Sequence, residues 1–316
     1  VNLGQASPMN VESNVPKVSV CVITYNQAGY VGQCLQSIVD QKTSFDFEVI
    51  VGDDCSTDDT PEIIQDFANR YPRLITPILN SRKIGGTENY LTTHLRARGE
   101  YVAHLDGDDI AFAGKLQRLS DCLDSRADLA AVWHAVIMFN DAGKTTGLLH
   151  RHIDDVIDTN NITRRDLLRF GSLGAASSIM YRRSSAAFLK SVNGAALDYY
   201  FATRLLEHGN AARLGDILGG YRYNPSAATL SKVGFKYFKC SPMRELYAAH
   251  LEEVLSRDTV VARDIFLNAL FNFCIELRFL RPSTWRFLAI ARKTFSLAGA
   301  RDIPEYFARA LRLRIR

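Results

Sequence analysis

Three carboxylates stand within four positions of the chain, Asp106, Asp108 and Asp109, directly after the apolar run YVAHL at 101–105. That run predicts a buried strand. Negative charges crowded at the end of a buried strand repel one another, and this costs stability unless a cation relieves it. Hard divalent cations take carboxylate oxygens and complete their shell with water and phosphate oxygens. The cluster therefore predicts that Asp106 and Asp108 hold Mg²⁺ or Mn²⁺ against a diphosphate.

Two further polar clusters also follow apolar runs. Thr24, Tyr25 and Asn26 end the run that begins at 18, and Asp53 and Asp54 end the run that begins at 47. Ligands of open α/β sheets bind at the carboxyl ends of the strands, so we expect all three clusters to share one crevice. For the Asp53–Asp54 pair alone, a turn or a helix cap is an equally open interpretation, because short polar residues follow it.

Alternating strands and helices must position these clusters. Each of four strand patterns is followed by a helical one, and the strand patterns are VSVCVIT (18–24), FEVIVGDD (47–54), LITPIL (74–79) and YVAHL (101–105). This alternation predicts a doubly wound, mostly parallel sheet flanked by helices.

The second half of the chain predicts a mixed sheet and then helices. LAAVWHAVIMFND at 129–141 alternates and closes with a turn sequence, which predicts a hairpin. We expect a loop over 150–175, a strand in SSIMYRR (177–183), a helix over 197–208 and a strand in DILGGYRYN (216–224). From Ser241 onward the pattern is helical, with a break at Pro282. The predicted domains are an unpacked lead-in over 1–16, an α/β domain over 17–235 and a helical, basic module over 236–316.

Composition limits the classes of partner. The chain has 316 residues, 47% of them hydrophobic, and its six cysteines form no CxxC pair, which argues against a zinc site or a disulfide framework. This cysteine use, with no signal peptide pattern and no apolar run of about 18 to 20 residues, predicts a cytoplasmic protein, soluble or peripheral at the inner face of the membrane.

The net charge of +4 is unevenly distributed along the chain. Residues 277–316 hold ten Lys and Arg against two acids, a net of +8, so the remaining residues sum to −4. A basic, aromatic end predicts either a solvated helix face or contact with an anionic membrane surface, and we expect no nucleic acid partner.

Other nucleotide motifs are missing from the sequence. It contains no GxxxxGK[ST] phosphate loop, and no GxGxxG follows the first strand pattern, so ATP hydrolysis and dinucleotide redox chemistry lack their usual signatures. A nucleotide diphosphate held by a metal ion fits the residues better.

The three segments VSVCVITYNQAGYVGQCLQSIVDQ, FEVIVGDDCSTDDT and ARGEYVAHLDGDD resemble the inverting nucleotide-sugar glycosyltransferases of family 2, which have the GT-A fold. The resemblance extends from Lys17 to about Leu230. It implies that Thr24, Tyr25 and Asn26 line the nucleotide site, with Tyr25 stacking on the base.

The resemblance also assigns roles to acidic and basic residues. Asp54, with Asp53 beside it, would accept a hydrogen bond from a uracil-type imide, and Arg82 would lie near the nucleotide. The D-x-D element of Asp106 and Asp108 would bind ribose and metal. Asp109 would extend this element toward the donor sugar.

Asp198 is the candidate general base. The segment LDYYFATRLLEHGNAARLGDILGGYRYN (197–224) resembles the part of these transferases in which an aspartate begins an acceptor-side helix, although Asp198 alone would read as a helix N-cap. Displacement at an anomeric carbon needs a base on the face opposite the leaving diphosphate. Four positions depart from the family pattern. Ile23 replaces a proline and Cys55 a glycine, which we interpret as packing variation, whereas Asn224 replaces a histidine that can join the metal and Glu88 replaces a basic residue.

The histidines are weaker site candidates than the acidic residues. His104 and His134 lie in strand patterns and are predicted to be core or cleft-wall residues, with His134 near enough to face the acceptor. His150 and His152 lie in a polar segment that could form a lid.

The function predicted from these residues is transfer of a sugar from a nucleotide diphosphate sugar, preferably a UDP-sugar, to a hydroxyl of a glycan or lipid-linked glycan, in bacterial surface polysaccharide assembly. A nucleotidyltransferase is the second hypothesis, but TYNQAGY (24–30) lacks the basic phosphate loop that it needs. A catalytically degenerate scaffold is the third, for which Asn224 and Glu88 leave an opening.

Overall fold

The computed structural model describes residues 15–149, 153–196, 198–223, 241–277 and 282–314. Within these ranges, nine strands form one sheet in the spatial order β3-β2-β1-β4-β8-β6-β9-β5, and β7 pairs with β6. The strands are β1 (Val18–Thr24), β2 (Phe47–Asp53), β3 (Ile75–Leu79), β4 (Tyr101–Asp106), β5 (Ile110–Ala111), β6 (Leu129–Phe139), β7 (Thr145–Leu148), β8 (Met180–Arg182) and β9 (Asn210–Arg222).

The first four strands are parallel, as the sequence predicts. β1 lies between β2 and β4, and β3 pairs with the outer side of β2. The connections contain α1 (Val31–Val39), α2 (Thr60–Arg70) and α3 (Gly86–His94). Pro77 lies in β3, which ends the sheet, and an edge strand tolerates a residue without a backbone N–H.

The second half makes the sheet mixed. β8 is antiparallel to both β4 and β6, whereas β6 and β9 are parallel to each other. The predicted hairpin is confirmed, because β6 and β7 pair antiparallel across a turn in which Asn140 N–H donates to Lys144 O at 3.1 Å. The short 3₁₀ segments here are η1 (Ile153–Asp155), η2 (Ala176–Ser178) and η3 (Arg183–Ser191).

Two predictions for this half are wrong in extent. The expected loop over 150–175 contains α5 (Arg164–Phe170), which Thr163 and Asp166 begin with a reciprocal capping box, and which buries two leucines. The strand expected over 216–224 begins earlier, at Asn210, because the backbone of β9 pairs along the whole length of β6 with several register shifts.

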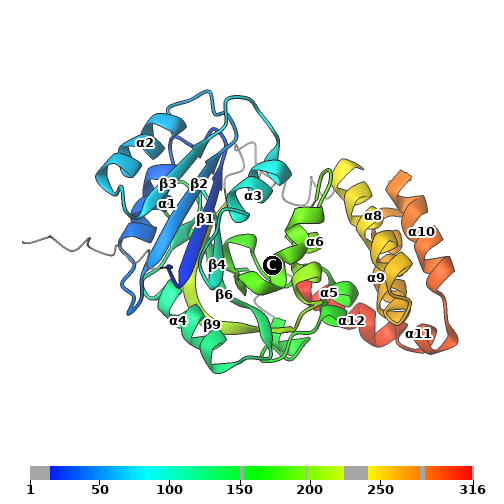
Figure 1. Cartoon of the computed structure of the whole chain (residues 1–316). Coiled ribbons are helices and arrows are strands. Elements are labelled where there is room, and N and C mark those ends of the chain that lie inside the picture. The colour runs from blue at the N-terminus through cyan, green and yellow to red at the C-terminus, as the bar shows by residue number, and fades with distance from the viewer. Residues whose placement is uncertain (1–14, 150–152, 197, 224–240, 278–281, 315–316) are drawn as a thin grey trace, which may run out of the picture.

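Helices cover both faces of the sheet (Figure 1). Alternate residues of β1 divide between the two faces: Val20 and Val22 pack with α1, α2 and α4 (Lys115–Ser125), whereas Cys21 packs on the opposite side. On that side lie α3, α5, α6 (Asp198–Leu205) and the C-terminal helices, which share one continuous apolar core.

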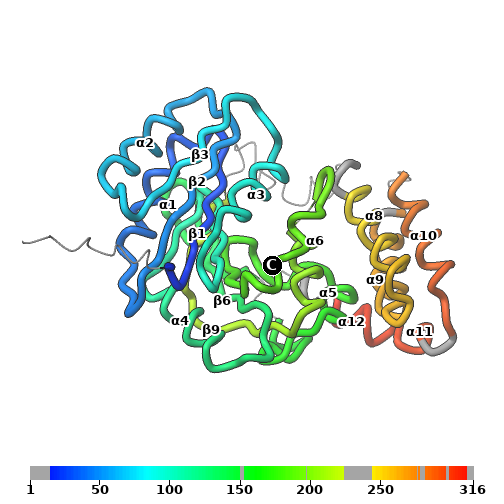
Figure 2. Tube along the Cα trace, viewed as in Figure 1, coloured from blue at the N-terminus to red at the C-terminus, as the bar shows by residue number. Residues whose placement is uncertain are grey.

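The C-terminal helices are α8 (Ser241–Arg257), α9 (Ala262–Glu276), α10 (Pro282–Thr294), α11 (Leu297–Arg301) and α12 (Ile303–Arg314). They confirm the predicted helical region, and α10 begins at Pro282. Figure 2 shows the chain returning along α12 toward α5, where the Tyr306 hydroxyl donates to Arg169 O at 2.7 Å.

Among the described residues, none of the helices combines the length and apolar character needed to cross a bilayer. The predicted boundary at 235/236 and most of the predicted lead-in fall outside the described residues.

Candidate active site

The ends of β1, β2 and β4 bring the three polar clusters together. Thr24 pairs in register with Asp53 at the end of β2, and Ile23 pairs with Asp106 at the end of β4. The Asp54 N–H donates to Thr24 O at 3.0 Å. The clusters therefore lie side by side as predicted, while the roles of the individual side chains stay predictions.

Both aspartates after β2 bind the protein itself. Asp53 accepts hydrogen bonds from the N–H of Ser56, at 2.9 Å, and from its hydroxyl. Asp54 Oδ1 accepts from the N–H groups of Ile84 and Gly85 at 2.7 and 3.0 Å, so it fixes the loop after β3. Each carboxylate has further lone pairs that can accept hydrogen bonds. A contact of either residue with a nucleotide base stays a prediction.

Asn26 ties the loop after β1 to the loop after β2. Its side-chain oxygen accepts from Thr57 N–H at 2.8 Å, and its own N–H donates to Ser56 Oγ at 2.8 Å. Asn26 and Cys55 have φ values of 52° and 59°, a left-handed conformation that is uncommon outside glycine. Asn26 therefore joins two loops that border the predicted nucleotide site.

A lysine that the sequence analysis did not single out covers Tyr25. Lys83 Nζ lies 3.6 Å from the centre of the Tyr25 ring, which is a close cation–π contact. Arg82, the predicted basic neighbour of the nucleotide, is exposed in the same loop. The bonds to Asp54 hold the backbone of the loop just after Arg82 and Lys83.

Both carboxylate oxygens of Asp106 have a partner in the protein. Oδ1 lies 3.2 Å from His104 Nε2, and Oδ2 accepts from Ser177 Oγ at 3.3 Å. About a third of the side chain, 33%, stays exposed. Burial opposes ionisation, but the hydrogen bonds from His104 and Ser177 lower the pKa of Asp106 overall. The group is thus an ionised carboxylate with lone pairs free for a ligand.

Asp108 and Asp109 lie deeper. Burial and then the charge of Asp106 raise the pKa of Asp108 to about 7, and burial together with the charges of both neighbours raises the pKa of Asp109 well above its usual range. Asp109 Oδ1 accepts from Arg222 N–H, and Arg222 Nε donates to Asp108 O, each at 2.8 Å. Arg222 on β9 therefore holds the acidic loop in place.

The acidic loop fits a hard divalent cation. The buried atoms Thr24 Oγ1, Gln27 Oε1 and Asp109 Oδ2 have no hydrogen-bond partner among the described residues, although Gln27 also hydrogen-bonds Asp108. Nowhere in the described part of the chain do three or more His, Cys, Asp or Glu side chains converge to hold a metal. A cation on Asp106 and Asp108 would therefore need diphosphate and water oxygens to complete its shell.

Asp198 begins α6 near Asp106. With His104 and Tyr90 it lines a cavity of about 30 Å³. The residue as a whole is exposed. Loss of water around its carboxyl group, and then the negative charge of Asp106, nevertheless raise the pKa of Asp198 to about 6. A carboxyl that titrates near neutrality and still meets solvent is suited to accept a proton.

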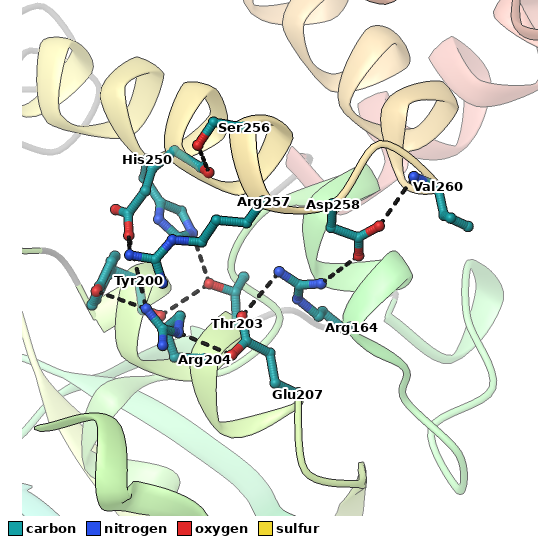
Figure 3. A network of polar contacts seen from close by, with 11 residues as sticks. Arg164, Tyr200, Thr203, Arg204, Glu207, His250, Ser256, Arg257, Asp258 and Val260 are labelled. Carbon is teal, nitrogen blue, oxygen red and sulfur yellow. Dashed lines mark hydrogen bonds and ion pairs between the residues drawn. The ribbon is translucent and has the colours of Figure 1, made fainter. Parts of the chain in front are cut away.

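The C-terminal helices hold α6 from behind (Figure 3). The Thr203 hydroxyl lies 2.7 Å from His250 Nε2 on α8, and Arg164 Nη1 on α5 donates to Asp258 at 2.8 Å. Arg164 also pairs with Glu207 at 3.1 Å, just past the end of α6. The helix that carries Asp198 is thus fixed to its surroundings at several points.

The remaining sequence predictions have mixed outcomes. His134 is a core residue, 1% exposed, whose Nδ1 lies 2.8 Å from the carbonyl of Ala135. Glu88 is exposed in the first turn of α3. A third group lies outside the described residues: Asn224, His150 and His152.

Sequence analysis missed three supporting side chains around the acidic loop: Gln27, Arg222 and Ser177. Gln27 directly follows Thr24, Tyr25 and Asn26 in the sequence, and this position could have predicted a place in the site. Arg222 and Ser177 reach the loop from distant parts of the chain, and no local pattern marks them.

Comparison with known proteins gives a family match over the same region. The model of the family described as "Glycosyl transferase family 2" matches residues 19–187. An uncharacterized protein of Mycobacterium tuberculosis (strain H37Rv) is 31% identical over 207 residues, which cover 65% of this chain and 58% of that protein. The chain thus spans little more than half the length of that relative. An abequosyltransferase of Salmonella typhimurium is 35% identical over 113 residues, 35% of this chain and 34% of the relative.

Solved structures share the fold at low sequence identity. S. aureus TarS 1-349 in complex with UDP-GlcNAc aligns with a TM-score of 0.65 and 18% identity, covering 94% of this chain and 88% of that chain. A mannosyltransferase from Pyrobaculum calidifontis, in complex with GDP-Man and Mn²⁺, aligns with a TM-score of 0.54 and 19% identity, covering 95% and 81%.

Proposed function

Because the chain belongs to glycosyl transferase family 2, we propose that it is an inverting, metal-dependent transferase. It moves a sugar from a nucleotide diphosphate sugar, with UDP-sugars favoured, to a hydroxyl of a glycan or a lipid-linked glycan. The proposal is supported above all by the proximity of two acidic groups: Asp106, which ends β4 just before Asp108, lies near enough to Asp198 at the start of α6 for its charge to raise the pKa of Asp198.

The proposed reaction is a single displacement. The acceptor hydroxyl oxygen bonds to the anomeric carbon, the bond from that carbon to the diphosphate oxygen breaks, and the electron pair leaves with the diphosphate. Asp198 takes the hydroxyl proton, so the acceptor attacks as a better nucleophile. General-base assistance of this kind typically contributes about 10² to 10⁴ in rate. One displacement inverts the configuration at the anomeric carbon.

Donor binding falls to the ends of the parallel strands. Tyr25 and Lys83 would contact the nucleotide, and Asp106 and Asp108 would hold the cation, which neutralises charge developing on the leaving diphosphate. Two proteins of the same fold, one complexed with UDP-GlcNAc and the other with GDP-Man and Mn²⁺, support a nucleotide-sugar donor and a divalent cation.

The acceptor belongs, in this proposal, to bacterial surface polysaccharide assembly. Similarity to the Salmonella abequosyltransferase supports transfer of a sugar. Contact with an anionic membrane, where a lipid-linked acceptor would lie, is supported by an exposed Trp285 and by exposed Arg292 and Lys293 on the same helix.

A donor screen tests the proposal. Release of nucleoside diphosphate is measured from a panel of UDP-, GDP- and CDP-sugars with Mn²⁺ or EDTA, for the wild type and Asp108→Ala. We expect one donor to be consumed, with loss of activity in EDTA and in the variant, and proton NMR to detect a product of inverted anomeric configuration. Release from no donor by a folded protein would favour the scaffold hypothesis, and release of pyrophosphate from a nucleoside triphosphate and a sugar phosphate would favour the nucleotidyltransferase.

A further inference from the structure

Behind Asp106 runs an unbroken line of buried polar side chains from two strands and one helix. The Tyr181 hydroxyl on β8 lies 2.7 Å from His94 Nδ1 at the end of α3, and His94 Nε2 lies 3.0 Å from His104 Nδ1 on β4. His104 Nε2 in turn lies 3.2 Å from Asp106 Oδ1. The two histidines and the tyrosine are each at most 3% exposed. The line thus connects a buried tyrosine of β8 to the partly exposed carboxylate of Asp106.

The positions of the hydrogen atoms in this line follow when both imidazoles are taken as neutral rings. An ionised Asp106 only accepts, so His104 must donate from Nε2. A neutral imidazole has one donor and one acceptor, so His104 Nδ1 accepts and His94 Nε2 donates to it. His94 Nδ1 then accepts, and Tyr181 supplies the hydrogen. Burial of the imidazole lowers the pKa of His94 well below its usual range, which agrees with a neutral ring.

Aromatic packing leaves the imidazoles little room to turn. The Tyr90 ring stacks on His94 with a centroid distance of 3.7 Å and an interplanar angle of 15°. Its other face stacks on Phe201 of α6 at 4.3 Å and 11°. The same ring therefore packs between the histidine line and the helix that begins with Asp198.

We propose that Tyr181, His94 and His104 form a positioning chain that aims the Asp106 carboxylate into the cleft, with both histidines carrying their hydrogen on Nε2. With Ser177 on Oδ2, each carboxylate oxygen has a protein partner and keeps further lone pairs for a ligand. Partners behind a metal ligand commonly change metal affinity about 10- to 100-fold when removed. This inference rests on the proposed function in that Asp106 is the donor-side ligand.

Histidine tautomers provide the first test, which needs no ligand. In the full chain labelled with ¹⁵N-histidine, proton–nitrogen correlation spectra show which ring nitrogen carries the hydrogen, and spectra of His94→Gln and His104→Gln assign the signals. We expect both residues as neutral rings with the hydrogen on Nε2. A hydrogen on Nδ1 of either ring would overturn the chain.

Affinity for Mn²⁺ provides the second test. Electron paramagnetic resonance measures free Mn²⁺ during titration of the protein with UDP and, separately, with GDP present. His104→Leu should weaken Mn²⁺ binding about 10- to 100-fold, whereas His104→Gln, whose amide can donate from a similar place, should retain most of it. Tyr181→Phe should weaken it less than His104→Leu, because it removes only the far end of the line.

The control is Tyr306→Phe, which removes a buried hydroxyl of α12 that bonds Arg169 O, far along the chain from the cleft. It should leave Mn²⁺ affinity unchanged, and circular dichroism with a thermal melt checks the fold of every variant. Equal affinity of wild type and a folded His104→Leu, or of wild type and Tyr181→Phe if the leucine variant does not fold, would contradict the positioning role. If the wild type itself binds no Mn²⁺ with either nucleotide, the donor-site proposal fails, and the tautomers alone decide on the chain.

Discussion

Replacing the candidate base is the sharpest perturbation of the proposed chemistry. Asp198→Asn keeps the size of the side chain at the start of α6 but removes its ability to accept a proton. Because general-base assistance contributes about 10² to 10⁴ in rate, we expect kcat to fall by that factor, which corresponds to about 3 to 5 kcal/mol of activation free energy.

The pKa of Asp198 gives the prediction a second signature. With a pKa of about 6, the carboxylate should be roughly nine-tenths ionised at pH 7, half at pH 6 and about one-tenth at pH 5. Since only the ionised form accepts a proton, wild-type kcat should rise with pH through about 6 and then level. The variant should lose this rise.

The assay follows release of nucleoside diphosphate from the donor, first as slow hydrolysis with water in place of the acceptor, and calorimetry measures donor affinity in parallel. Asp121→Asn, which changes an exposed carboxylate on α4, is the matched control and should behave as the wild type. The reasoning is refuted if kcat of Asp198→Asn falls less than about threefold, or if donor affinity falls as much as kcat.

Two further predictions concern stability. Thr203→Val removes the hydroxyl that joins α6 to His250, so the free energy of unfolding in urea should fall by about 1 to 2 kcal/mol, whereas Thr203→Ser should restore most of it; an unchanged urea midpoint in the valine variant would show that the contact contributes nothing. Glu48 is 9% exposed, and although burial opposes its ionisation, hydrogen bonds from Arg98 and Ser19 lower its pKa. Glu48→Gln should therefore cost about 1 to 3 kcal/mol at pH 7. Because a lowered folded-state pKa stabilises only above the unfolded value, this difference should shrink as the pH falls below 4.5 and through the folded pKa, and a constant difference down to pH 3 would contradict the assignment.

Much of the fold follows from local patterns. Each parallel strand of the first half is a largely apolar run, and a helical pattern follows it within a short stretch of sequence. The extent of β9 is different, because its first half contains Arg213 and Gly215 and becomes a strand only by pairing with β6. The missed helix α5 was legible in the sequence, since Thr163 and Asp166 have capping-box spacing before two leucines.

The candidate site divides in the same way. The placement of Asp53 beside Thr24, and of Asp106 beside Ile23, follows from the rule that parallel strands end at one edge. The bonds of Asp54 to the loop at 84–85 and the approach of His94 to His104 depend on the tertiary course of α3, which no local pattern encodes.

Asp106 and Asp108 are proposed to bind a nucleotide diphosphate through a divalent cation, and direct titration of the nucleotides would reveal that binding. UDP, GDP and CDP are titrated calorimetrically, each with Mn²⁺ and with EDTA, into the wild type and Asp108→Ala. The account predicts that one diphosphate, UDP by preference, binds tightly only with Mn²⁺ and only to the wild type. Binding of no nucleotide by the folded wild type, or equal binding in EDTA and in Asp108→Ala, would contradict it.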